Sequence, residues 1–136
     1  MKTFTDTDLA AMREAAGLLK LGEIKVEEEI EEGATSLSLD GFAIDIEEGE
    51  RQVMTIAGNR MVPCTDYVVY AEHHSAGSYW DPPEVDLVEV ARENSPLNAL
   101  AAVALAVAQQ QIDNVMESMY WNHYHVEEPE LVWCER

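Results

Sequence analysis

The chain has 136 residues, of which 47% are hydrophobic, and its 27 acidic and eight basic side chains give a formal net charge of −19. This hydrophobic content excludes wholesale disorder, and the length suffices for a single domain over residues 1–136 that buries a core without metals or disulfides. So negative a charge disfavours binding to nucleic acid or to anionic membranes and favours basic partners, although acidity that serves only solubility is an equally simple interpretation.

Two cysteines, Cys64 and Cys134, lie seventy positions apart, and no positively charged apolar leader begins the sequence. This pattern favours a reducing compartment, the cytoplasm of a bacterial host. We expect both thiols to stay free there, with a pairing between them as the alternative.

A threonine cap and helical spacing of apolar residues predict a first helix from residue 5 or 7 to about residue 19, ended by Gly22. Alternating polarity then predicts a half-buried strand over residues 23–31. Glu28 falls on the apolar face of that strand, which indicates either a β-bulge or an exposed strand end.

The middle of the chain predicts an antiparallel meander of four to six strands between Glu23 and Val90. Asp40-Gly41 separates two alternating runs, which predicts a hairpin, although a bulge within one longer strand would shift the alternation equally well. Pro63 predicts that the next strand begins at an edge or after a loop. Beyond the hairpin, we expect strands at residues 52–56, 67–71 and 84–90.

A loop rich in glycine and aromatic residues, 73–83, leads into the last predicted strand. Two strands joined by such a loop, followed by Pro-Pro-Glu-Val-Asp-Leu at 82–87, resemble small phage and prophage proteins of unassigned function. The resemblance covers residues 62–92.

The long helix predicted from Ser95 and Pro96 to about His123 is the element around which we expect the fold to be built. A core-facing stripe is predicted from Ala101, Leu105, Ala108, Ile112, Val115, Met116 and Met119. Because the first three turns are apolar on every side, a second cover is needed, either the first helix or a second copy of the chain. We expect a homodimer whose interface contains Val103, Val107, Trp121 and Trp133. Together these elements predict an α+β fold, with an N-terminal helix and this long helix packed on the meander.

Acidic residues are concentrated in one segment, because residues 21–50 contain eleven acids and one base. Alternate residues of a strand lie about 6.6 Å apart on one face, close to the phosphate spacing of a nucleic-acid strand. Such a row can bind lysine and arginine side chains that normally contact nucleic acid, or it can be a solvated face that prevents edge pairing. We predict that Glu27, Glu29, Glu31, Asp45, Glu47 and Glu48 bind a partner.

Catalytic and metal-binding motifs are not found in the sequence. His123 and His125, with the pair His73-His74, have a permissive but unspecific spacing for metal, and no base accompanies Cys64. We therefore expect no metal, no cofactor and no enzymatic activity.

In character, this combination resembles the small acidic inhibitors that phages direct against host nucleic-acid systems, such as anti-CRISPR proteins and anti-restriction DNA mimics. It implies an inhibitor that binds the basic nucleic-acid-binding surface of a host complex. The alternatives are an oligomeric phage structural or assembly protein, and a small metal-binding enzyme that uses the histidine-rich segments.

Overall fold

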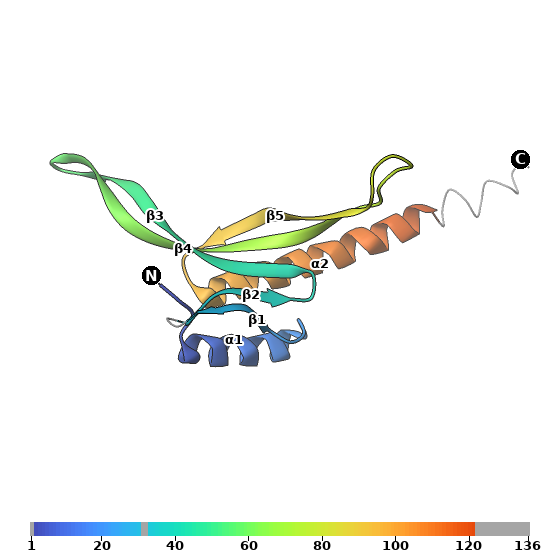
Figure 1. Ribbon diagram of the computed structural model, residues 1–136, viewed down its shortest axis with the longest axis horizontal. Coiled ribbons are helices and arrows are strands. Elements are labelled where there is room, and N and C mark those ends of the chain that lie inside the picture. The colour runs from blue at the N-terminus through green and yellow to red at the C-terminus, as the bar shows by residue number, and fades with distance from the viewer. Residues whose placement is uncertain (1, 31–32, 122–136) are drawn as a thin grey trace, which may run out of the picture. The chain divides into compact units, whose positions relative to one another are not determined.

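A computed structural model describes residues 2–30 and 33–121 of the chain. Five strands pair in sequence order, β1-β2-β3-β4-β5, and every pairing is antiparallel (Figure 1). This is the predicted α+β arrangement, with one helix before the meander and one after it. The chain forms two compact units, residues 1–103 and 104–136, which we describe separately. The elements are α1 (Asp6–Leu19), β1 (Lys25–Ile30), β2 (Gly33–Leu39), β3 (Phe42–Thr55), β4 (Gly58–Ser75), β5 (Glu84–Glu93) and α2 (Pro96–Trp121).

Helix α1 begins where the threonine cap predicts. The Thr5 hydroxyl accepts a hydrogen bond from the Asp8 backbone N–H, while the Asp8 carboxylate accepts one from the Thr5 N–H, so the two residues form a capping box. The helix ends at Leu19, as predicted. Lys20, with φ of 57°, takes the left-handed cap position that the sequence analysis assigned to Gly22.

Of the two alternatives for Glu28, the β-bulge is present. Strand β1 pairs with β2 from Lys25–Ser38 to Ile30–Gly33, and the register shifts on both sides of Glu28. The shift interrupts the two-residue repeat within the predicted row of glutamates, since a bulge adds an unpaired residue.

The Asp40-Gly41 hairpin is confirmed, and Gly41 takes a positive φ of 84°, which glycine adopts without steric cost. The strands that follow are longer than predicted, because β3 is continuous and β4 runs through Pro63. Residues 48–65 form a two-stranded ribbon, the arm, in which β3 and β4 pair only with each other. Figure 1 shows the arm projecting beyond the other strands. Pro63 thus lies within an edge strand and not at the start of one, because β4 already begins at Gly58.

Most of the core of the first unit lies on one face of the sheet. Leu37, Ile44 and Val69 are fully buried, and so is Met12 of α1. The rings of Phe4 and Tyr67 meet with centroids 5.8 Å apart. This burial of large apolar side chains is the main stabilising contribution to the unit.

Helix α2 is buried on a different face from the one predicted. Val103, predicted to lie in a dimer interface, is 1% exposed, and Ala99 and Leu100 beside it are equally buried. The predicted core stripe is instead exposed. The sequence could not separate the faces because the first turns are apolar all round. Val107 is half-buried, Trp121 is exposed and Trp133 lies outside the described residues. The stripe residues with exposed side chains are Leu105, Ile112, Val115, Met116 and Met119.

No helix within residues 2–30 and 33–121 combines the length and the apolar content needed to cross a membrane.

Candidate protein-binding face of the sheet

The face of the sheet opposite Leu37, Ile44 and Val69 carries many polar side chains around Val68, which is fully buried there. Directly paired residues of antiparallel strands point to the same side, so Asp45 of β3 shares its face with Ser36 of β2. In the same way, Glu47 lies beside Asp66, and Tyr70 lies beside Glu89 of β5. We call this side the polar face. Its polar side chains include Lys25, Glu27, Ser36, Ser38, Asp45, Glu47, Arg51, Asp66, Tyr70, Glu72, His74, Glu89 and Arg92.

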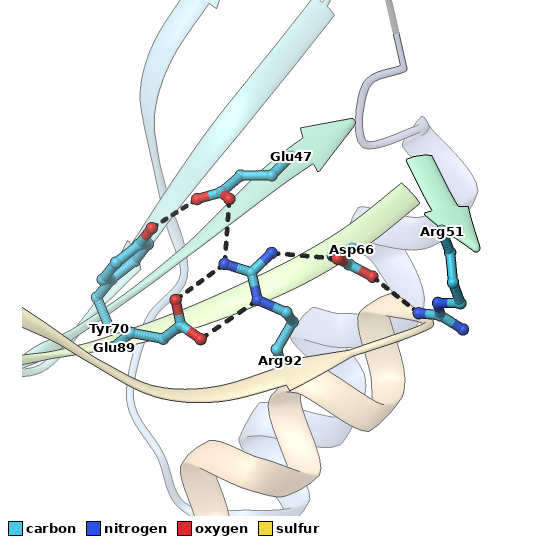
Figure 2. Close-up of polar contacts among 6 residues, drawn as sticks. All are labelled: Glu47, Arg51, Asp66, Tyr70, Glu89 and Arg92. Carbon is cyan, nitrogen blue, oxygen red and sulfur yellow. Dashed lines mark hydrogen bonds and ion pairs between the residues drawn. The ribbon is translucent and has the colours of Figure 1, made fainter. Parts of the chain in front are cut away.

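One guanidinium joins three carboxylates on this face, as Figure 2 shows. Arg92 donates two hydrogen bonds to Glu89, from Nη2 at 2.9 Å and from Nε at 3.2 Å. Its Nη1 donates to Asp66 Oδ2 at 3.1 Å, and Nη2 also reaches Glu47 Oε1 at 3.3 Å. Arg51 at the base of the arm adds a longer ion pair, 3.6 Å, to Asp66. We call Glu47, Asp66, Glu89 and Arg92 the arginine cluster. Each of the three guanidinium nitrogen atoms of Arg92 donates to at least one acid.

Protonation in the cluster is shifted by these contacts. Tyr70 donates a hydrogen bond of 2.6 Å to Glu47 Oε2. That bond, followed by burial and by the charges of nearby carboxylates, raises the pKa of Tyr70 to about 12. Hydrogen bonds to Glu89 and Asp66 raise the pKa of Arg92, so the guanidinium stays charged.

A second part of the polar face is acidic without such compensation. A hollow of about 270 Å³ is lined by Glu27, Asp45 and Glu72 together with Ser36, Ser38, Phe42, Ala43 and Leu87. We call it the acidic groove.

The groove carboxylates are held by neutral donors. Ser38 donates a hydrogen bond of 2.6 Å to Glu27, and Ser36 donates one of 2.6 Å to Asp45. Within the described part of the chain, neither of these two acids forms an ion pair. Glu72 contacts His74 at 3.1 Å. The hydroxyls orient the two acids but leave their charges in place, so the groove is suited to a cation with several donors.

The six predicted partner-binding residues are divided by the structure. Glu27, Asp45 and Glu47 lie on the polar face, but Glu47 is occupied by Arg92 and Tyr70. Glu48 has the opposite strand parity, and its carboxylate accepts a hydrogen bond of 3.3 Å from the Lys2 backbone N–H. For Glu29 the structure describes the backbone pairing only, and Glu31 lies outside the described residues.

Sequence reasoning missed Asp66, Glu72, Glu89 and Arg92. Their meeting depends on strand register, which the alternation of a single strand does not contain. One signal was available, because Arg92 is the sole lysine or arginine between Arg60 and Arg136. A single base among many acids is a candidate for multiple ion pairs.

The histidines that the sequence analysis weighed as metal ligands do not come together in the described residues. His73 and His74 are exposed neighbours in β4, so they point to opposite sides of the strand. Across residues 2–30 and 33–121, no three His, Cys, Asp or Glu side chains converge closely enough to hold one metal ion. His123 and His125 lie outside this range. Cys64 is a half-buried free thiol, and Cys134 is also outside the described residues.

Comparisons with protein-family models, with curated proteins and with solved structures found no match to this chain.

Proposed function

We propose that this protein is a non-enzymatic inhibitor that uses its polar face to bind a basic, nucleic-acid-binding surface of a host protein. The observation that supports this most directly is the acidic groove, in which Glu27 and Asp45 are fixed by serine hydroxyls and have no ion-pair partner in the described chain. Carboxylates that are already oriented and have no ion-pair partner bind an incoming cation most favourably, because little free energy is spent on ordering them.

The arginine cluster shows what such a contact requires. Arg92 uses its planar fork against three acids on the same face, with four donor–acceptor distances between 2.9 and 3.3 Å. An arginine or lysine of a partner would meet a comparable set of acceptors in the groove, with the two serine oxygens beside them. A protein surface evolved for phosphates presents such side chains in arrays.

Competition with nucleic acid is the expected mode of inhibition. A chain with a net charge of −19 approaches a basic surface quickly and displaces the DNA or RNA that binds there. In this proposal the chain acts in the bacterial cytoplasm in the manner of anti-CRISPR or anti-restriction proteins.

The test is capture from a bacterial lysate on immobilised protein, followed by mass spectrometry, across a series of salt concentrations. Capture of a nucleic-acid-binding protein that falls with salt and with added DNA or RNA supports the proposal. The double variant Glu27→Lys/Asp45→Lys should abolish capture, and Glu27→Gln/Asp45→Asn should weaken it.

A matched control carries the same charge change elsewhere. Glu14→Lys/Glu23→Lys replaces two exposed acids outside the polar face. The control should retain most of the capture, and equal loss in both lysine variants would show that net charge alone binds the partner. Circular dichroism of every variant verifies the fold. Capture that survives the groove variant contradicts the proposal.

A second candidate, a structural or assembly protein, is favoured by the apolar residues of the arm. Met54 is 83% exposed, and Ile56 at the tip is fully exposed. Exposed apolar side chains on a projecting ribbon are typical of surfaces that insert into a neighbour. Co-purification of the chain with phage particles, lost when Met54 and Ile56 are changed to serine, would establish this function instead.

A further inference from the structure

The exposed stripe of α2 has the spacing of a coiled-coil seam. Its members are separated alternately by four and three residues, which keeps them on one line along a pair of supercoiled helices. Leu105 is 73% exposed and Ile112 is 52% exposed, so both are available to another chain. The seam residues are Ala101, Leu105, Ala108, Ile112, Val115 and Met119.

This seam is free of charge in a molecule that is otherwise strongly acidic. No charged residue occurs from Asn94 to Ile112, and the two acids that follow, Asp113 and Glu117, fall outside the seam positions. Asp113 also accepts a hydrogen bond of 2.9 Å from Gln109. If a second copy approached most other surfaces, the negative charges of the two copies would repel each other. Contact through this helix face adds no such repulsion between facing residues. The charge distribution therefore selects the seam for self-association.

The sizes of the seam side chains indicate whether two paired helices run parallel or antiparallel. Along the seam a smaller residue alternates with a larger one, in the order Ala101, Leu105, Ala108, Ile112, Val115, Met119. If two helices run antiparallel about a twofold axis near residue 110, each large residue lies opposite a small one. Ile112 then faces Ala108 of the second copy, and Leu105 faces its Val115.

A parallel pair would place alanine opposite alanine, and the void between them costs stability. The helix surface is already hollowed at this place. A hollow of about 340 Å³ is lined by Ala108, Ile112 and Val115, with Gln111 and Met116 at its sides. In the antiparallel register it receives the Ile112 side chain of the second copy.

We propose that the chain forms a homodimer through antiparallel pairing of α2, with Ala108 opposite Ile112 at its centre. This pairing is independent of the acidic groove. It also responds to salt in the opposite direction, because salt screens the repulsion between two acidic copies while it weakens binding to a basic partner.

Light scattering during size exclusion measures the dimer directly. The wild-type chain should have twice the monomer mass of 15.2 kDa at about 100 µM, and Ile112→Glu should halve that mass. Gln110→Glu adds the same charge outside the seam and should remain dimeric. A wild-type monomer, or a dimer that persists in Ile112→Glu, would overturn the proposal. Loss of partner capture has no bearing on it.

Cross-linking fixes the register without a destabilising charge. Ala108→Cys and Ile112→Cys are made separately in a Cys64→Ser/Cys134→Ser background. Oxidation of a mixture should give the 108–112 heterodimer as the main product, because the antiparallel register brings those positions together. Ala108→Cys that cross-links to itself would indicate a parallel pair and contradict the register.

Discussion

The base and the arm of the β3–β4 hairpin are built by one uninterrupted pairing, yet they differ in almost every physical respect. In the base, β2 and β5 flank the hairpin, and Ile44, Val68 and Val69 are fully buried. In the arm, neighbours are absent from both edges among the described residues, and side chains from 48 to 61 are exposed. The charge also changes, since the arm contains two acids and two arginines and is therefore neutral. Pairing alone makes a strand, but only a third element gives it a core.

The largest effect should come from the base. Ile44→Ala removes a fully buried side chain and should lower the free energy of unfolding by about 2–5 kcal/mol, because it loses apolar burial and leaves a cavity. Ile56→Ala at the exposed tip of the arm is the matched control and should change it by less than ~0.5 kcal/mol. Urea unfolding followed by circular dichroism measures both. Equal losses would show that the arm contributes to the core.

The arginine cluster, at the junction of base and arm, comes next. Arg92→Gln leaves Glu47, Asp66 and Glu89 facing one another, so we expect a lower thermal midpoint at pH 7. At high salt the deficit should shrink, because salt screens the repulsion among these three carboxylates. Arg13→Gln on α1 is the control, since Arg13 has no ion pair within the described chain. A deficit independent of salt would mean that packing by the arginine stem dominates.

A smaller effect in the base concerns the titration of Tyr70, which can be followed by ultraviolet spectroscopy. Its pKa of about 12 lies above the ordinary value of 10, so the folded state favours the protonated phenol. This contribution to stability is complete below pH 10 and is lost as the pH rises through about 12. The ultraviolet titration of wild type minus Tyr70→Phe should show that midpoint, and Glu47→Gln should lower it. A midpoint near 10 in the wild type would contradict the hydrogen bond.

The smallest effect on stability should come from removing the arm. Replacing residues 50–63 by Asn-Gly joins Gly49 to Cys64, which are paired in the hairpin, through a turn suited to two strands. The free energy of unfolding should change by less than ~1 kcal/mol, since the deleted side chains are almost all exposed. Groove-dependent capture should persist. Loss of capture in a folded variant would move the binding site to the arm.

Local signals predicted much of this fold. The cap at Thr5, the turn at Asp40-Gly41 and the bulge at Glu28 each depend on a few neighbouring residues, and each is present. The continuity of β3 through Gly49 was not predicted, because glycine between acids is typical of a loop. Pairing with β4 along the whole length overrides that preference.

The candidate site was less accessible from sequence, because its residues come together only through register. Glu27 and Asp45 were predicted from local acidity, but Glu72 is contributed from another strand. For α2 the difficulty was that both faces are apolar, so the sequence did not identify the buried one. Val103 and Leu105 are both apolar members of α2, and only the packing of Ala99, Leu100 and Val103 identifies the buried face.

Pro63 has a consequence for how the chain behaves at high concentration. It pairs with Glu50 in the arm, and it has no N–H to donate. An unpaired ribbon edge is a template on which further strands can add and grow into fibrils. An incoming strand would find a donor missing from the middle of this edge, so its ladder would be interrupted there. The proline thus makes the β4 edge of the arm a poorer template for strand addition.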